Sequence, residues 1–166
     1  MNVNRVLDNI RGRVDQSSLT DSCGGEGCGV DMTGVPSERV VIHVEREFDS
    51  RNMTEKRCDR LLFYTAGNNI VAALIELKSG RAEQSDVVEK LENSLRFATN
   101  IAPRQQVFKT VYVPVLFHGR DIKWTNPNKG LKQLNARFGG KNLQILRGRC
   151  DAPKNLWEVL SNSGNL

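Results

Sequence analysis

The spacing of apolar residues along the chain predicts a mixture of helices and strands. Apolar residues recur with helical periodicity in residues 3–15 and 84–98, which is typical of amphipathic helices. Short runs rich in β-branched or apolar residues predict strands over 39–45, 59–65, 70–78 and 107–117. The two middle runs are apolar on both faces, as in strands that are covered on each side. The pattern therefore predicts an α/β sandwich.

The length of the chain predicts a single domain, residues 1–166, because a chain of this length fits one core. Residues 16–37 are rich in Gly and Ser and predict a long loop, and the polar residues 46–57 predict a connection. The C-terminal predictions are a short helix over 129–137, a strand over 143–146, a helix over 155–160 and a flexible tail over 161–166. The predicted core order is helix-strand-strand-strand-helix-strand, in a three-layer sandwich around a mixed sheet.

Ionisable residues occupy one end of the predicted hairpin, where core residues would be expected. Symmetric pairing about the turn sequence AGNN places Thr65 opposite Ile70 and Asp59 opposite Glu76. Directly opposed residues share a face of the sheet, with Cβ atoms about 5 Å apart. Lys78 follows Glu76 by two residues and shares that face. The register therefore brings Asp59, Glu76 and Lys78 together, whereas a slip of one residue would separate Asp59 from the other two.

This group of charges favours metal-dependent chemistry. Two neighbouring carboxylates repel each other unless positive charge compensates them. Lys78 supplies one charge, and Mg²⁺ or Mn²⁺ would supply two more. Mg²⁺ is typically held by one or two carboxylates with waters and substrate phosphates, and it can activate water for hydrolysis. Since the pKa of an ammonium shifts readily in a confined site, Lys78 can hold or deprotonate that water. The combination suits hydrolysis of a phosphodiester.

An aspartate at the start of one strand, followed by Glu-x-Lys near the end of the next, resembles the PD-(D/E)xK superfamily of nucleases. The predicted order of elements in residues 1–117 is similar to the core of that superfamily. The resemblance implies a restriction-endonuclease-like fold and Mg²⁺-dependent cleavage of DNA. It also implies that Asp59 and Glu76 bind the metal and that Lys78 is the catalytic lysine.

The sequence departs from the superfamily pattern in two places. Cys58 stands where many members have a proline, and the helix after the motif has no clear Gln-x-x-x-Tyr, although Gln84 precedes it and Lys90 lies in its middle. Many such enzymes add an acidic residue from an earlier element. Three residues are candidates for this additional acid, and no spacing decides among them: Glu45, Glu47 and Asp31.

The charge distribution points to a polyanionic partner. Residues 1–102 hold thirteen Lys and Arg against sixteen Asp and Glu, whereas residues 103–166 hold eleven against three, a net of about +8. The expected partner is nucleic acid, with DNA as the expected substrate. The candidate phosphate contacts are Arg81, Arg120, Lys123, Lys129, Lys132, Arg137 and Lys141. Two aromatic residues within the basic segment, Trp124 and Phe138, can stack on bases or anchor a loop to the core.

The expected setting is the cytoplasm. No stretch is long and apolar enough to predict a membrane span, and the N-terminus lacks the apolar centre of a secretion signal. The four cysteines are therefore expected to be reduced thiols. A chain of this size that cuts both strands of a duplex is expected to need a homodimer or a partner subunit.

Other interpretations stay open at this point. Glu76 and Lys78 can be an ion pair without chemistry, and the chain can be an inactive nucleic-acid-binding or adaptor subunit. A zinc-stabilised interaction module would use the four cysteines, Cys23, Cys28, Cys58 and Cys150, although their spacing is unlike that of zinc knuckles. A cysteine protease would pair Cys58 with a histidine. His43 reads as a core residue of its strand, and His118 as a residue at the rim of a site.

Overall fold

The computed structural model describes residues 2–25, 27–104, 107–119, 134–150 and 155–162. The helices are α1 (Val3–Arg11), α2 (Val44–Ser50), α3 (Gln84–Ile101) and α5 (Leu156–Ser161), with one 3₁₀ turn, η1 (Gln16–Ser18). The strands are β1 (Leu19–Thr20), β2 (Arg39–His43), β3 (Arg60–Ala66), β4 (Asn69–Lys78), β5 (Lys109–His118), β6 (Asn135–Phe138), β7 (Lys141–Gln144) and β8 (Leu146–Arg149). None of the described helices is long and apolar enough to cross a bilayer.

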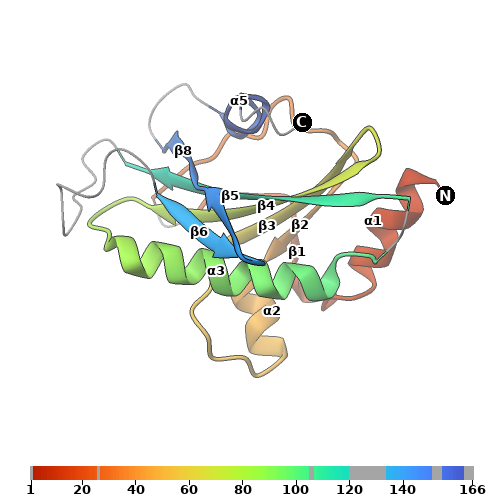
Figure 1. The fold of residues 1–166 in the computed structure, drawn as a ribbon, viewed down its shortest axis with the longest axis horizontal. Coiled ribbons are helices and arrows are strands. Elements are labelled where there is room, and N and C mark those ends of the chain that lie inside the picture. Colours follow the sequence, from red (N-terminus) through yellow and green to blue (C-terminus); the bar gives the residue numbers. More distant parts are fainter. Residues whose placement is uncertain (1, 26, 105–106, 120–133, 151–154, 163–166) are drawn as a thin grey trace.

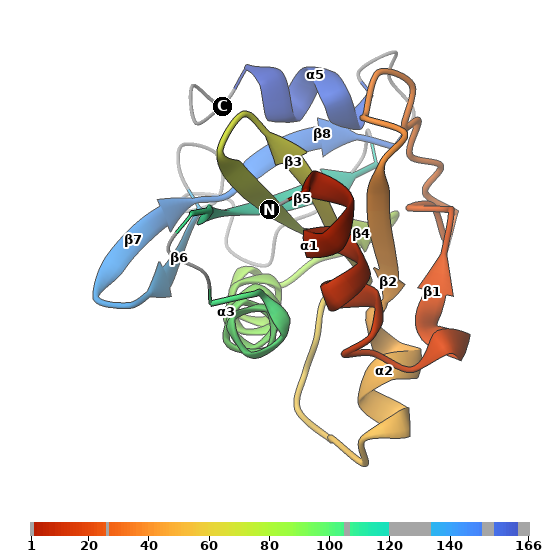
Figure 2. The same cartoon turned by 90° about the vertical axis from the view of Figure 1, so that its right-hand side faces the viewer.

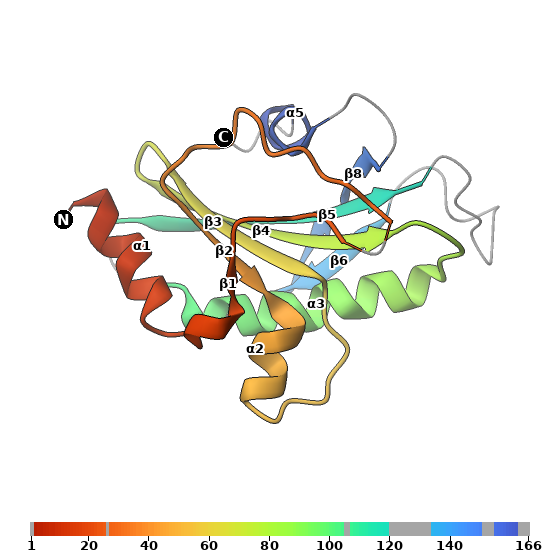
Figure 3. The same cartoon turned by 180° about the vertical axis from the view of Figure 1, so that it is seen from behind.

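A mixed six-stranded sheet forms the middle layer, in the order β1-β2-β3-β4-β5-β8. Strands β1 to β4 pair antiparallel, whereas β5 lies parallel to both β4 and β8. Helix α3 runs along one face of the sheet and α5 lies over the other (Figure 1). Helix α2 projects from the sheet on the side of α3 (Figure 3). The prediction of an α/β fold around a mixed sheet is confirmed.

Two apolar clusters fill the spaces between the layers. The cluster on the α3 side combines α1, α2 and α3 with alternate residues of β3 and β4, including Leu7, Phe48 and Leu74. The cluster on the α5 side takes the other set of alternate residues, including Ile75 and Leu77. Both faces of the central strands are therefore buried, as their uninterrupted apolar sequences predicted.

The predicted hairpin register is confirmed. Thr65 pairs with Ile70, and the antiparallel ladder continues to Arg60 opposite Ile75. The amide of Asp59 also donates to the carbonyl of Ile75, over 3.0 Å, at the end of this ladder. The order α1, β2, β3, β4, α3, β5 also follows the predicted core.

Two predictions of local structure were wrong. Residues 44–50 form helix α2, not the end of a strand and a polar loop, because His43 caps the helix and Phe48 buries its side chain completely. Residues 135–138 form strand β6, not the end of a helix, and the part of that predicted helix over 129–133 lies outside the described residues. Gly139 and Gly140, both with positive φ, join β6 to β7 in a tight turn.

Smaller differences concern the irregular segments. The predicted loop over 16–37 contains η1 and β1, which pairs with the edge of β2. The predicted strand over 143–146 is two strands, β7 and β8, which belong to different sheets. Figure 2 shows the β6–β7 hairpin projecting beside α3. The C-terminal helix was predicted within one residue of its bounds.

The prediction of four reduced cysteines was wrong for one pair. Cys28 and Cys150 form a disulfide across 122 residues of sequence, with Cα atoms 4.8 Å apart. Cys23 and Cys58 are free and buried. Cys58 packs in the cluster on the α3 side, whereas the other three cysteines pack on the α5 side. Because the sheet separates them, the four thiols do not form a zinc site.

Gly148 of β8 offers a test of the packing between β8 and β5. A Cβ atom at this position would overlap the ring of Phe117, which is fully buried. Gly148→Ala is therefore expected to lower the free energy of unfolding by about 1–3 kcal/mol, the usual cost of overpacking. Chemical denaturation of the variant and of Gly29→Ala, where a Cβ meets nothing within 4 Å, measures the difference. Equal stabilities of the two variants would contradict this close packing.

Candidate active site

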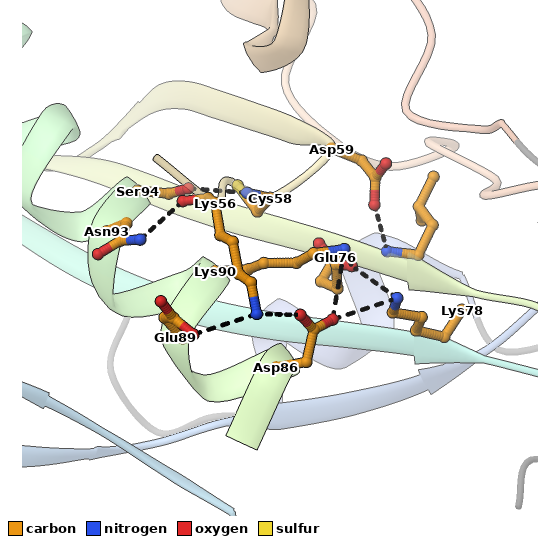
Figure 4. Close-up of polar contacts among 11 residues, drawn as sticks. Lys56, Cys58, Asp59, Glu76, Lys78, Asp86, Glu89, Lys90, Asn93 and Ser94 are labelled. Carbon is orange, nitrogen blue, oxygen red and sulfur yellow. Dashed lines mark hydrogen bonds and ion pairs between the residues drawn. The ribbon is translucent and has the colours of Figure 1, made fainter. Parts of the chain in front are cut away.

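The hairpin ends and the first turns of α3 together hold a cluster of charged side chains (Figure 4). Asp59 lies just before β3, and its Oδ2 accepts a hydrogen bond from the amide of Leu77 over 2.8 Å. Glu76 and Lys78 project from the end of β4 toward α3. Figure 4 shows Glu76 between Asp59 on one side and Asp86 on the other. The structure thus places Glu76 and Lys78 in one ion-paired cluster, with Asp59 close enough for its charge to act on Glu76.

Glu76 is a buried carboxylate held by two ammonium groups. Its side chain is 1% exposed. Oε1 lies 3.0 Å from Nζ of Lys90 and 3.6 Å from Nζ of Lys78. The other oxygen, Oε2, is also buried, and no hydrogen-bond donor of the described residues reaches it. A buried acceptor without a partner costs free energy, so a further ligand at Oε2 would be favourable.

The environment disfavours the charged form of Glu76. Burial raises the pKa of its carboxyl group to about 8, and the negative charge of Asp59 acts in the same direction. Lys90 and Lys78 oppose this shift without cancelling it. Burial also disfavours the charge on Lys90, but the contact with Glu76 outweighs it and raises the pKa of Lys90. The site therefore has an unmet demand for positive charge next to Glu76.

Asp86 extends the cluster on the α3 side. Its Oδ2 lies 3.6 Å from Nζ of both Lys78 and Lys90, and its Oδ1 lies 3.0 Å from Nζ of Lys56. Burial acts to raise the pKa of Asp86, but the hydrogen bond from Lys56 and the neighbouring charges outweigh it and lower the pKa. Asp86 does not cap α3, because the helix begins after Glu83 without a side-chain cap. Asp86 instead fixes the positions of three lysines.

A surface cavity of about 270 Å³ gives access to this cluster. Asp59 and Lys90 line it together with Glu45 from the first turn of α2. Of the three candidates for an additional acid, Glu45 is thus the one that shares a cavity with Asp59. Glu45 and Glu55 thus line the same cavity as Asp59, whereas Glu76 and Lys78 do not line it.

The other two acid candidates serve the structure elsewhere. Glu47 is 1% exposed; its carboxylate accepts from Nε of Arg51 over 2.8 Å and from the amide of Asp15 over 2.9 Å. Asp31 is exposed and accepts from the amide and hydroxyl of Thr33. Neither is placed with Asp59, so their assignment as additional metal ligands is not supported.

The protease alternative does not fit the surroundings of Cys58. Burial raises the pKa of its thiol to about 12, so the nucleophilic thiolate is disfavoured. The ring of His43 accepts the amide of Arg46 over 3.4 Å and so caps α2, and burial lowers its pKa. His118 ends β5, next to Lys78 in the parallel register.

The predicted phosphate contacts fall in three places. Arg81 is exposed in the connection between β4 and α3, close in sequence to the cluster. Arg137 and Lys141 are exposed on the β6–β7 hairpin, beside Phe138, whose ring packs against Tyr112. The remaining four, and Trp124, lie outside the described residues: Arg120, Lys123, Lys129 and Lys132.

Sequence analysis missed the roles of Lys90, Asp86 and Lys56. Asp86 and Lys90 are four residues apart on α3 and form an ion pair, a spacing that the sequence displays. The rotation of the helix about its axis decides whether this pair faces β4 or solvent. The apolar face formed by Val87 and Leu91 points to the sheet. The position of this face is the sequence feature from which the orientation of the ion pair could have been predicted.

Comparison with known proteins adds no family assignment. No protein-family model matches the chain, and no curated protein or solved structure matches it either. The arguments for function therefore rest on the geometry of the cluster.

The donors in the cluster fit a hard divalent cation. Asp59 and Glu76 offer carboxylate oxygens, and Oε2 of Glu76 is buried without a hydrogen-bond donor among the described residues. No group of three or more His, Cys, Asp or Glu within the described ranges has the arrangement of a complete metal site. Mg²⁺ often uses only one or two carboxylates and takes its other ligands from water and substrate phosphates, so two acids are compatible with Mg²⁺ or Mn²⁺.

Proposed function

We propose that the protein is a metal-dependent nuclease that hydrolyses phosphodiester bonds of nucleic acid, with DNA as its substrate. Asp59 and Glu76 bind Mg²⁺ or Mn²⁺, and Lys78 acts on the attacking water. The PD-(D/E)xK resemblance and a restriction-endonuclease-like fold are part of this proposal, and the strand order with its antiparallel β2–β3–β4 and parallel β5 supports it. The observation that carries the proposal is the buried carboxylate oxygen Oε2 of Glu76 beside Asp59.

Each side chain has a separate task in the proposed reaction. When bound between the carboxylates, a divalent cation supplies the charge that activates water and stabilises the phosphoryl oxygens. Glu76 and Asp59 fix its position from two adjacent strands. As an ammonium group, Lys78 holds the attacking water and stabilises the developing negative charge; as the neutral amine, it accepts the proton of that water. Asp86 positions the ammonium of Lys78 from the opposite side, 3.6 Å away.

In this proposal Lys90 forms an ion pair with Glu76 when no divalent cation is bound. Its ammonium group lies 3.0 Å from Oε1 and therefore compensates the buried charge. Asp86 lies 3.6 Å from the same ammonium group and offers it an alternative partner. Lys90 would keep Asp86 as a partner if a divalent cation took its place beside Glu76.

The direct test is cleavage of labelled single- and double-stranded DNA and RNA by the purified chain. Mg²⁺ and Mn²⁺ are expected to support strand cleavage, and EDTA is expected to prevent it. Products in EDTA would contradict the proposal, as would the lack of products from all four substrates with either metal. Cleavage of both strands of a duplex is expected to require a homodimer or a partner subunit, which light scattering in the presence of duplex can detect.

A second candidate function is a catalytically inactive nucleic-acid-binding or adaptor subunit. The observation in its favour is that Lys78 and Lys90 already compensate Glu76 without a metal. Such a subunit would bind nucleic acid with equal affinity in EDTA and in Mg²⁺ and would leave it uncut.

Lys90→Met is expected to reveal the competition between the lysine and the cation. Without metal, the variant loses the closest partner of Glu76, and its free energy of unfolding falls by about 1–3 kcal/mol. With Mn²⁺ it is expected to gain more thermal stability than the wild type, because the cation no longer displaces an ammonium group. Lys56→Met is the matched control, since the ion pairs of Lys56 within the described residues are with Asp86 and Glu89 and not with Glu76. An equal gain from Mn²⁺ in all three proteins would contradict this role.

The raised pKa of Glu76 predicts how stability depends on pH in EDTA. Between the ordinary pKa of 4.5 and about 8, Glu76 is protonated in the folded state and ionised in the unfolded state. The folded state binds more protons in this window, so the contribution of Glu76 to stability falls as pH rises. Glu76→Gln removes this contribution. The free energy of unfolding of the variant minus that of the wild type is therefore expected to increase from pH 5 to pH 8. Denaturant unfolding at several pH values measures it; a constant difference would contradict the shift.

A further inference from the structure

The first half of β5 carries a second concave surface, distinct from the cavity at Asp59. Two cavities of about 480 and 450 Å³ share Thr110 and Tyr112 in their walls. Among the described strands, β8 pairs with β5 only from Val115 onward, so β5 has no strand neighbour on that side along its first half. The β6–β7 hairpin contributes Phe138 and Lys141 to the larger cavity.

Two aromatic rings form the floor of this surface. Tyr112 and Phe138 lie with their ring centroids 5.1 Å apart and their planes tilted by 54°. Both are half-buried and pack against the core on the α3 side, which holds the rings in place. A fixed, partly exposed aromatic pair is suited to stacking on flat rings, and nucleobases of any sequence offer such rings.

The rim of the surface is positively charged. Lys109 and Lys141 are exposed and line the larger cavity, and Arg104 is exposed and lines the smaller one. No carboxylate is present among the described residues that line either cavity. Lysines around an aromatic floor match a ligand that carries both flat rings and phosphates.

We propose that Tyr112 and Phe138 form a stacking platform for a single-stranded segment of nucleic acid, whose phosphates contact Lys109, Lys141 and Arg104. The proposal rests on the proposed function in that the ligand is the polyanion that the nuclease would cut. Tyr112 pairs with Ala72, which precedes Glu76 by four residues on β4. The platform therefore lies about 13 Å from the candidate active site along the strand direction.

Binding in EDTA tests the charged rim independently of cleavage. Fluorescence anisotropy measures the affinity for a short labelled oligothymidylate, with an oligouridylate of equal length to compare DNA with RNA. The double variant Lys109→Glu/Lys141→Glu is expected to lose at least about tenfold in affinity, and the slope of log K against log salt is expected to decrease by about 0.7 per lost contact. Arg5→Glu/Arg46→Glu reverses two exposed charges on α1 and α2 and is expected to change the affinity by less than about twofold. Equal losses in the two double variants would overturn the proposal.

Photochemical cross-linking tests the stacking. An oligonucleotide that contains 5-iodouracil is expected to cross-link to peptides that contain Tyr112 or Phe138, and Phe138→Leu is expected to reduce the yield from protein that a thermal melt shows to be folded. Cross-links confined to other peptides would overturn the proposal, as would binding of acidic peptides but not of oligonucleotides. If the platform binds oligonucleotide and no metal supports cleavage, the platform proposal is supported and the proposed nuclease function is refuted. If cleavage occurs while the platform variants bind oligonucleotide as tightly as the wild type, only the platform proposal is refuted.

Discussion

Glu76→Gln is expected to reduce metal-dependent strand cleavage by at least about 10³-fold, the range seen when a charged group essential to the transition state is removed. Gln has nearly the same shape, so it fills the same buried space, but its amide is a weak ligand for Mg²⁺ compared with a carboxylate. Cleavage of labelled DNA under single-turnover conditions measures the loss.

The stability of the same variant separates catalysis from structure. Because the charged form of Glu76 is disfavoured by burial and by Asp59, its replacement by a neutral amide is expected to leave the fold intact at pH 8 in EDTA. If Glu76 were only a structural partner of Lys90, the variant would lose stability and any cleavage would persist in the folded fraction. Glu89→Gln is the control, since Glu89 contacts Lys56 at the exposed edge of the same cluster. Retention of wild-type cleavage in Glu76→Gln would refute the assignment.

Lys78→Met is expected to reduce the rate of the chemical step by about 10²–10⁴-fold, the usual contribution of a positioned proton-transfer group. The side chain of Lys78 is 22% exposed and lies between two carboxylates, with Nζ 3.6 Å from Glu76 and 3.6 Å from Asp86. Met keeps most of the aliphatic stem and removes the ammonium group. Since Lys78 is not a metal ligand in the proposal, the affinity for Mn²⁺ and for oligonucleotide is expected to remain within about threefold of the wild type.

A reduced rate of the chemical step with unchanged affinities distinguishes a group that acts on the reaction from one that only binds substrate. A phosphate-binding lysine would change the affinity and its salt dependence, whereas Lys78 is expected to change the single-turnover rate at saturating DNA. Lys78→Arg keeps the charge but cannot accept a proton. It is expected to remain impaired if Lys78 transfers a proton, and to recover activity if its charge alone stabilises the transition state. An unchanged rate in Lys78→Met would remove Lys78 from the mechanism.

The part of the site that lies on the hairpin was predictable from the sequence because its determinants are local. The turn sequence and the apolar strands on either side fix the register, and the register places Asp59 beside Glu76. Side-chain alternation then places Lys78 on the same face as Glu76. Each step depends on neighbours within one supersecondary unit, so no knowledge of the rest of the fold was needed.

The part of the site on α3 was missed because it depends on how the helix packs. Lys90 reaches Glu76 only because α3 lies across the sheet with this face toward the end of β4. Glu45 reaches the cavity only because residues 44–50 form a helix, whose burial of Phe48 is a tertiary contact. The sequence also left three acids equivalent, whereas in the fold Glu45 lines the cavity, Glu47 is buried against Arg51, and Asp31 is exposed in the loop after β1.

Contacts between separate elements explain the other errors. Cys28 and Cys150 are 122 residues apart in sequence, and only the arrangement of β8 against the loop after β1 brings them together. Residues 135–138 have a composition compatible with helix, but the two glycines that follow permit a tight turn and a partner strand. In both cases the deciding contact comes from a different element.

The central claim is that Asp59 and Glu76 form a binding site for a divalent cation. The most direct measurement is a titration with Mn²⁺ followed by electron paramagnetic resonance, on the wild type and on Glu76→Gln at pH 8. The account predicts one bound ion in the wild type, displaced by excess Mg²⁺, and no ion bound at that affinity in Glu76→Gln. Equal binding in the two proteins, or no binding in the wild type even with oligonucleotide present, would contradict it.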